Sequence, residues 1–266
     1  MTLFDRALFA DRVCLVTGGG SGIGAEIALQ FARHGARVAV LGRSAAKLDT
    51  TVRALEAEGA QGLALAADVR DAHALEAAVA HITQHWGRLD VLVNAAAGNF
   101  LSPAATLSAN GFRTVIDIDL CGTFNACRAA YAALAARRGV IVNITASPQG
   151  FVAMPLQCHA GAAKAGIEKL TRDLALEWGP AGVRVVAVAP GPIANTEGMS
   201  RLAPGDAAET MQQKMPLGRW GRSDEVASAV MYLASPAAGF ITGTTLTVDG
   251  GAGLLGAGCF LAALNL

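Results

Sequence analysis

Short apolar runs alternate with longer amphipathic segments along nearly all of this 266-residue chain. The runs have the length of buried strands, and the segments between them have the apolar spacing of helices. The segment that joins two parallel strands has to cross over one face of the sheet, and it is usually a helix, so helices come to cover both faces. We therefore predict an α/β fold with a doubly wound sheet of seven parallel strands. The expected strands are Arg12–Thr17, Ala36–Leu41, Gly62–Ala67, Leu89–Asn94, Gly139–Ile144, Val183–Ala189 and Thr244–Val248, and the expected helices cover about 22–34, 44–58, 71–86, 108–137, 157–178 and 223–235.

The composition fits one large domain. Hydrophobic residues make up 53% of the chain, and neither a Pro-, Gly- or Ser-rich linker nor a repeat divides it. We predict a single domain over residues 1–266. The formal net charge is zero, which argues against nucleic acid or an acidic membrane as a partner.

Neither end of the chain shows a recognisable targeting signal. Met1–Asp11 has no long apolar stretch, which argues against a signal peptide. The apolar tail Gly251–Leu266 is too short and glycine-rich to span a bilayer, so we expect a buried end or a subunit contact. The final Leu264-Asn265-Leu266 is no peroxisomal signal. With five cysteines and no C-x-x-C pair, these features predict a cytoplasmic protein.

A glycine-rich turn joins the first expected strand to the first expected helix. It reads Thr17-Gly18-Gly19-Gly20-Ser21-Gly22-Ile23-Gly24. Glycines let backbone N–H groups approach a pyrophosphate at the positive end of a helix, so this turn predicts a dinucleotide site. The spacing differs from the general G-x-G-x-x-G fingerprint, and a plain flexible turn is the alternative interpretation.

The end of the second expected strand bears on the choice of cofactor. It reads Val40-Leu41-Gly42-Arg43-Ser44, with one arginine and no acid. An acid near this position binds a ribose 2′-hydroxyl, whereas an arginine accommodates a 2′-phosphate through its planar fork of donors. Arg43 therefore predicts NADP(H), unless it is only a solvated residue at the start of a helix.

The segment Pro190–Pro216 breaks the alternation because it is rich in proline and glycine. A long irregular segment inside a compact domain is often a lid or a binding loop. We predict a substrate lid over residues 190–216.

Several further motifs accompany the glycine-rich turn. They are Asp68-Val69, Asn94-Ala95-Ala96-Ala97-Gly98, Pro190-Gly191 with Ile193 and Thr196, and Val248-Asp249-Gly250-Gly251. In the turn and in these motifs the chain resembles the short-chain dehydrogenase/reductase family over essentially its full length. The resemblance implies a single-domain Rossmann fold, a homotetramer, and cofactor contacts beyond those of the turn. Asp68-Val69 would contact the adenine, and Ile193 and Thr196 would lie near the nicotinamide amide.

One position departs from the usual family pattern. Ala160 stands four residues before Lys164, where most members have a tyrosine one helical turn from the lysine. In those members the ammonium lowers the pKa of the phenol, which then acts as an acid. Either this chain is catalytically inactive, or its hydride transfer uses another proton donor.

Four stretches of the chain point to a closer resemblance. They are Asn94-Ala95-Ala96-Ala97-Gly98-Asn99-Phe100, Asp117-Ile118-Asp119-Leu120-Cys121-Gly122-Thr123-Phe124-Asn125, His159-Ala160-Gly161-Ala162-Ala163-Lys164 and Pro190-Gly191-Pro192-Ile193…Thr196-Glu197-Gly198. In these stretches the chain resembles the peroxisomal-type 2,4-dienoyl-CoA reductases, which also lack the tyrosine. They carry an aspartate where most relatives have the catalytic asparagine, and here that residue is Asp119. The resemblance implies that Asp119 and Lys164 position a proton-delivering water, with Lys164 also reaching the nicotinamide ribose.

The chemistry is consistent with the missing phenol. Reduction of a conjugated thioester gives a delocalised dienolate that hydrogen-bond donors can hold, and protonation then occurs at carbon. The resemblance implies an acyl-CoA substrate contacted by Asn99 and Phe100, with His159 lining the acyl pocket. Ser147 lies thirteen residues before Ala160, but alignment on Val142–Thr145 puts Ala146 at the family's serine position, so the register stays open. Core or structural roles remain alternatives for Phe100 and His159.

These observations predict an NADPH-dependent reductase of 2,4-dienoyl-CoA esters in unsaturated fatty-acid β-oxidation. Reduction of trans-2-enoyl-CoA or another conjugated substrate is the nearest alternative, and a non-catalytic NADP-binding sensor is one from a different class. We expect no metal, because His81 and His85 lack the further ligands of a zinc site. The sequence does not determine the length of the acyl chain or whether the protein is a tetramer or a dimer. It also does not show which arginines bind the CoA phosphates.

Overall fold

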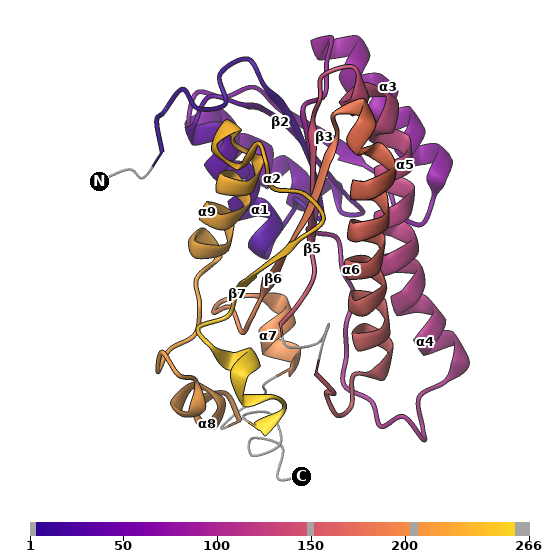
Figure 1. Cartoon of the computed structure of the whole chain (residues 1–266), viewed down its shortest axis with the longest axis vertical. Helices are drawn as coiled ribbons and strands as arrows, with labels where there is room; N and C mark the ends of the chain where they lie inside the picture. The colour runs from indigo at the N-terminus through magenta and orange to yellow at the C-terminus, as the bar shows by residue number, and fades with distance from the viewer. Residues whose placement is uncertain (1–3, 148–151, 203–206, 259–266) are drawn as a thin grey trace.

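Seven parallel strands form one sheet, as predicted (Figure 1), and they lie in the order β3-β2-β1-β4-β5-β6-β7. The computed structural model describes residues 4–147, 152–202 and 207–258. The strands follow the apolar runs within one or two residues at each end. Their bounds are Val13–Thr17 (β1), Arg37–Gly42 (β2), Gly62–Ala66 (β3), Val91–Asn94 (β4), Val140–Ile144 (β5), Arg184–Pro190 (β6) and Thr245–Val248 (β7).

Helices cover both faces of the sheet because neighbouring strand residues point to opposite sides. Cys14 and Val16 of β1 pack in one core, with apolar residues of α1, α2 and α9. Val13 and Leu15 pack in a second core, with residues of α3, α5 and α6. The bounds of these helices are Gly22–Arg33 (α1), Ala45–Ala57 (α2), Ala72–Trp86 (α3), Gly122–Ala135 (α5), Cys158–Trp178 (α6) and Ser223–Ala234 (α9).

The helix predicted over 108–137 is interrupted, and the prediction of one continuous helix is wrong here. The observed order is α4 (Ala109–Ile116), a π-helical turn η1 (Asp117–Cys121) and then α5. A π turn inserts an extra residue into a helix and is often found at functional sites. Gly122 follows this turn against Val69, and a Cβ at Gly122 would lie only 2.6 Å from the Val69 Cγ2.

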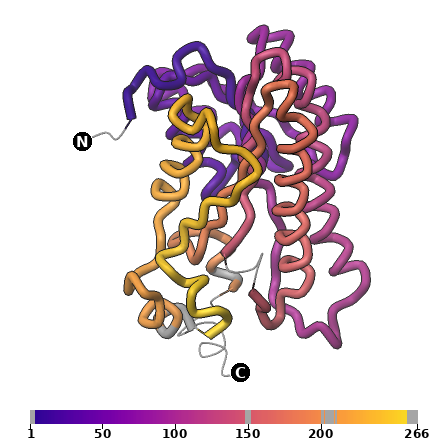
Figure 2. Tube along the Cα trace, viewed as in Figure 1, coloured from indigo at the N-terminus to yellow at the C-terminus, as the bar shows by residue number. Residues whose placement is uncertain are grey.

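Two short helices lie in the segment that the sequence predicted as irregular. They are α7 (Glu197–Leu202) and α8 (Ala207–Lys214). Figure 2 shows them with the short helix Ala252–Leu255 (η4) at one end of the molecule, beyond the carboxyl ends of β6 and β7. Proline and glycine between the helices hide their periodicity in the sequence.

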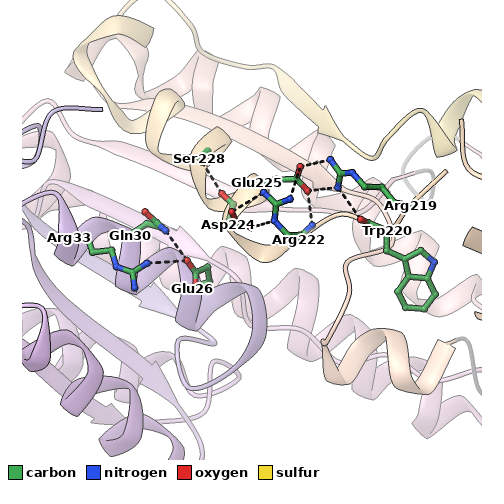
Figure 3. A network of polar contacts seen from close by, with 9 residues as sticks. All are labelled: Glu26, Gln30, Arg33, Arg219, Trp220, Arg222, Asp224, Glu225 and Ser228. Atoms are coloured by element: carbon green, nitrogen blue, oxygen red, sulfur yellow. Dashed lines mark hydrogen bonds and ion pairs between the residues drawn. The ribbon is translucent and has the colours of Figure 1, made fainter. Parts of the chain in front are cut away.

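A polar cluster fixes the chain where this segment leads into α9 (Figure 3). The Glu225 side chain accepts hydrogen bonds from the Arg222 N–H, at 2.8 Å, and from both Nη atoms of Arg219, at 2.6 and 2.9 Å. The Arg219 guanidinium lowers the pKa of Glu225 to about 2. The start of α9 is therefore anchored by a carboxylate that stays ionised.

None of the helices in the described part of the chain is long and apolar enough to cross a lipid bilayer. Of the apolar tail, residues 259–266 lie outside the described residues, so the predicted contact of that tail stays a prediction.

Candidate active site

Asp119 and Lys164 form an ion pair at the carboxyl end of the sheet. The Lys164 Nζ lies 3.1 Å from the Asp119 Oδ2, and the two side chains are 9% and 1% exposed. Lys164 also donates to the carbonyl of Ile144, the last residue of β5, at 3.2 Å. The other carboxylate oxygen of Asp119 accepts the N–H of Gly98, after β4, at 2.7 Å. The predicted pair therefore exists, and both carboxylate oxygens are held.

The phenol of the usual family pattern has no counterpart at this pair. Ala160 lies one turn before Lys164 on α6 and is 1% exposed. Tyr131 packs on Trp178 with ring centroids 4.6 Å apart, which is about 21 Å along α6 from Lys164 at the usual helical rise. Tyr232 lies on α9, in the layer that covers the other face of the sheet. Neither tyrosine can supply the proton.

A groove of about 600 Å³ runs along the carboxyl ends of the strands. Most of the residues predicted to bind the cofactor line it, together with the predicted substrate residue Asn99. The predicted residues in its lining are Gly18, Gly20, Ser21, Gly22, Ile23, Gly24, Arg43, Asp68, Val69, Ala95, Ala96, Asn99 and Thr196.

The glycine-rich turn has the geometry that a dinucleotide requires. Gly18 has φ +68°, and a Cβ there would lie 2.7 Å from the backbone of Ala95. A Cβ at Gly24 would lie 2.4 Å from the Gly18 carbonyl oxygen, so only glycine lets α1 start this close to β1. The first turn of α1 contains no acid to repel a phosphate. The residues present therefore fit a pyrophosphate.

The charged residues of the groove gather near the start of α2. Arg43 and Lys47 both line the groove, and so does Asp68. The Asp68 carboxylate is paired with Arg70 at 2.6 Å, and hydrogen bonding from Arg70 lowers the pKa of Asp68. Arg43 thus faces the groove beside an Asp68 carboxylate that already has its own partner, whereas Lys47 is paired with Glu197, which also lines the groove. This arrangement suits an anionic group on the ribose.

Thr17 and Asn94, which were also predicted to contact the cofactor, do not line the groove but hold together the strand ends beneath it. The Thr17 Oγ1 accepts the N–H groups of Ala95 and Ala96 at 3.2 and 3.4 Å. The Asn94 Nδ2 donates to the Asn143 Oδ1 at 2.9 Å, which ties β4 to β5.

Pro190 ends β6 and Gly191 follows it, and both belong to the edge of the sheet and do not line the groove. The Pro190 carbonyl accepts the N–H of Ser147 at 2.8 Å, and the Gly191 N–H donates to Val248 at 3.0 Å. Ile193 is 3% exposed and packs in the core.

The predicted substrate residues Asn99, Phe100 and His159 lie together, near the Asp119–Lys164 pair. The Asn99 Nδ2 donates to the Gln157 Oε1 at 2.8 Å, and the rings of Phe100 and His159 are 4.5 Å apart. His159 is fully buried, and this burial lowers its pKa, whereas the Phe100 backbone and the Asp119 carboxylate act in the opposite direction. His159 is therefore a neutral imidazole near neutral pH.

Ser147 is held away from this group. Its hydroxyl donates to the Asp249 Oδ2 at 2.6 Å, and the same oxygen accepts the N–H of Gly253 at 2.8 Å. The register at Ala146 and Ser147 thus places Ser147 against the turn that follows β7. Residues 148–151, which come next, lie outside the described residues.

Sequence reasoning missed three participants. The Gly98 N–H and Gln157 are positioned only by the approach of distant elements. Lys47 lies in the first turn of the helix expected over 44–58, which directly follows Arg43, so its place near Arg43 could have been anticipated. Across 4–147, 152–202 and 207–258, no group of three or more His, Cys, Asp or Glu side chains could hold a metal ion.

Comparison with known proteins identifies the family. The family model described as Enoyl-(Acyl carrier protein) reductase matches residues 18–253. The chain is 48% identical over 255 residues to a peroxisomal 2,4-dienoyl-CoA reductase [(3E)-enoyl-CoA-producing] of Pongo abelii, covering 95% of this chain and 87% of that protein. It is 46% identical to the protein of the same name from Arabidopsis thaliana, covering 93% and 86%.

A solved structure supports the same assignment. The citronellol catabolism dehydrogenase of Pseudomonas aeruginosa PAO1 is 40% identical and superposes with a TM-score of 0.82, covering 95% of this chain and 99% of that one. The chain belongs to the short-chain dehydrogenase/reductase family. It is an oxidoreductase of that family, which uses a nicotinamide cofactor.

The prediction of a cytoplasmic location is contradicted by these comparisons. The relatives from Pongo abelii and Arabidopsis thaliana are both named peroxisomal. The prediction rested on the absence of recognisable address segments, and such an absence does not determine a compartment.

Proposed function

We propose that this protein reduces 2,4-dienoyl-CoA esters with NADPH, in the oxidation of unsaturated fatty acids. The observation that carries the proposal is the buried Asp119–Lys164 pair beside Ala160, a site that has a held carboxylate and no phenol. The names of the relatives support the same substrate class. The 2′-phosphate form of the cofactor is supported by Arg43 on the groove.

The nicotinamide, when bound, supplies a hydride to the far end of the conjugated system. The negative charge that results is spread over the dienolate and the thioester oxygen, so no single alkoxide has to be neutralised. A water held by Asp119 and Lys164 then delivers a proton to the carbon next to the thioester. One double bond remains, and the product is a 3-enoyl thioester.

The wall formed by Asn99, Phe100 and His159 orients the acyl group in this proposal. The amide of Asn99 is fixed by Gln157, which makes it a rigid partner for the thioester. The Phe100 ring offers an apolar surface to the acyl chain, and the buried, neutral His159 ring packs against it. The described parts of the predicted lid, 190–202 and 207–216, would close over the acyl chain, whereas residues 203–206 lie outside the described residues.

Turnover with three thioesters tests the proposal. NADPH oxidation is followed with 2,4-hexadienoyl-CoA, 2-hexenoyl-CoA and acetoacetyl-CoA, and the product of the first is identified by NMR. We expect turnover of the dienoyl ester to a 3-enoyl product and little reduction of acetoacetyl-CoA. Preferred turnover of 2-hexenoyl-CoA would instead make the protein a 2-enoyl reductase. Binding of NADPH without turnover of any thioester would favour a sensor.

The assembly that we propose is a homotetramer. It is supported by large apolar side chains left exposed on α5, on α6 and near β7, namely Phe124 at 42%, Leu176 at 84% and Phe240 at 106% exposure. Light scattering gives the molecular mass of the assembly in solution, and a monomer at micromolar concentration would contradict the proposal.

A further inference from the structure

Lys47 and Glu197 form an ion pair that joins α2 to α7. Both residues line the cofactor groove, but they come from segments 150 residues apart in the sequence. Glu197 is the first residue of α7, which lies in the predicted lid. The pair is thus a direct connection between the fixed wall of the groove and the lid.

The pair spans the glycine-rich turn. On one side, a Cβ at Gly20 would lie 3.2 Å from the Cβ of Lys47. On the other side, a Cβ at Gly22 would lie 4.0 Å from the Cγ2 of Thr196, the residue before Glu197. The ion pair therefore connects the two sides of the stretch Gly20–Gly22, where a pyrophosphate would rest.

Helix α7 depends on such external contacts. It has six residues, and a helix this short is not stable by itself. The Thr196 Oγ1 accepts the Met199 N–H at 3.2 Å and donates to the Ile193 carbonyl at 2.9 Å. These contacts fix the start of the helix to its own segment, whereas the ion pair fixes it to α2.

We propose that the Lys47–Glu197 pair is a strap over the phosphate cradle, which holds α7 against α2 and slows release of the dinucleotide. Both side chains are about half exposed, at 51% and 57%, so the strap is weak enough to open during each catalytic cycle. The inference rests on the nicotinamide cofactor of the family and is independent of the acyl substrate.

The rate of cofactor release tests the strap. Dissociation of NADPH is measured by stopped-flow fluorescence in Glu197→Gln, in Lys47→Met and in the double variant. Each single change should raise the dissociation rate constant by about two- to fivefold, the range of an exposed ion pair. Because both changes break the same contact, the double variant should release NADPH no faster than the faster single variant. Added salt should accelerate release in the unmodified protein and bring it toward Glu197→Gln.

A matched control removes the same charge elsewhere in the lid segment. Glu209 lies on α8 and accepts a hydrogen bond from Gln213, so Glu209→Gln should leave the release rate unchanged. Hydrogen exchange of the amides in 197–202 is measured without cofactor, and it should be faster in Glu197→Gln and in Lys47→Met but not in Glu209→Gln. This second measurement also shows whether each variant is folded.

Two results would overturn the strap. In the first, Glu197→Gln leaves the rate of NADPH release unchanged, which would mean that the pair does not hold the cofactor. Slower release in this variant would overturn the strap too, because the carboxylate would then only repel the phosphates. In the second, the effects of the single changes multiply in the double variant. NADH shares the pyrophosphate and should give the same pattern, whereas an effect of Lys47→Met confined to NADPH would place Lys47 at the 2′-phosphate instead. The readout is release, so failure to reduce dienoyl-CoA would not alter it.

Discussion

The ammonium of Lys164 lies 3.1 Å from the carboxylate of Asp119, on the face of α6 where Ala160 presents only a methyl group. The pair is buried, and the Gly98 N–H and the Ile144 carbonyl fix its orientation. Removal of one partner would leave the other charged and buried, which is strongly unfavourable. The site therefore depends on both residues.

Loss of charge at Asp119 should abolish most of the activity. Asp119→Asn keeps the shape and can still accept the Gly98 N–H, but it cannot hold a proton-delivering water with Lys164. We expect kcat with 2,4-hexadienoyl-CoA to fall by about 10²- to 10⁴-fold, the usual contribution of acid–base catalysis. Lys164→Met should reduce kcat at least as much and should also weaken NADPH binding.

The matched control for this prediction is Asp117→Asn, in the same π turn. Asp117 forms no ion pair or side-chain hydrogen bond with Lys164 in the described part of the chain, and its variant should retain the activity within about twofold, as surface changes usually do. Full activity in Asp119→Asn would contradict the proposed role of the carboxylate. Steady-state kinetics with saturating NADPH distinguishes a lower kcat from weaker cofactor binding.

Arg43 should determine the preference for the 2′-phosphate. In Arg43→Ala the Kd for NADPH should rise about tenfold or more, because a hydrogen bond to a charged group contributes about 1.5–3 kcal/mol. The Kd for NADH should change little. Arg43→Lys should be intermediate, since an ammonium lacks the planar fork of donors. Fluorescence titration with both dinucleotides gives the comparison, and an equal loss for both would rule out a specific role.

A methyl group at Gly122 should disturb the π turn. The Cβ of alanine would lie 2.6 Å from the Val69 Cγ2, so either α5 or the Asp68-Val69 segment must move. Overpacking of this kind costs about 1–3 kcal/mol. We expect Gly122→Ala to lower the free energy of unfolding by that amount and also to lower kcat, because Asp119 belongs to the same turn.

Gly179→Ala is the matched control for Gly122→Ala. Nothing lies within 4 Å of a Cβ at Gly179, and its φ is −51°, which any residue adopts. Urea unfolding of both variants should show a loss of stability only in Gly122→Ala. Equal stability of the two variants would show that the π turn absorbs the methyl group without strain.

Glu168 should make stability depend on pH. Neither of its carboxylate oxygens has a hydrogen-bond partner among the described residues, and burial raises its pKa, with Arg172 acting against the shift. An acid with a raised folded pKa favours folding at low pH and loses that contribution as pH rises from the unfolded pKa through the folded one. Glu168→Gln should therefore raise the free energy of unfolding at pH 8 by about 1–3 kcal/mol, the cost of an unsatisfied buried group.

The gain in Glu168→Gln should be small at pH 4, where the carboxyl group is protonated in both states. Urea unfolding at the two pH values measures the difference, and the exposed Glu177→Gln on the same helix serves as the control. Lower stability of Glu168→Gln at pH 8 would show that the carboxylate has a partner in the assembled protein.

Elements with a local signal were predictable. The strand β1 is an apolar run, the turn after it is marked by glycines, and both appear where the sequence placed them. The interruption of 108–137 was not predictable, because a π turn at Asp117–Cys121 leaves the apolar spacing almost unchanged. The helices α7 and α8 were not predicted either, because each is too short to show a clear period.

The sequence by itself determined the order of strands and helices, the phosphate-binding turn and the absence of a phenol at Ala160, because each of these is encoded within one short stretch. The resemblance already implied that Asp119 meets Lys164, and the tertiary structure gave the geometry of that pair. Only the tertiary structure decided that Asn94 joins Asn143 and that Lys47 reaches Glu197. Such pairs depend on sheet register and on how the helices pack across the strands. Local periodicity fixes which face of an element is buried, but it does not fix which distant residue will lie opposite.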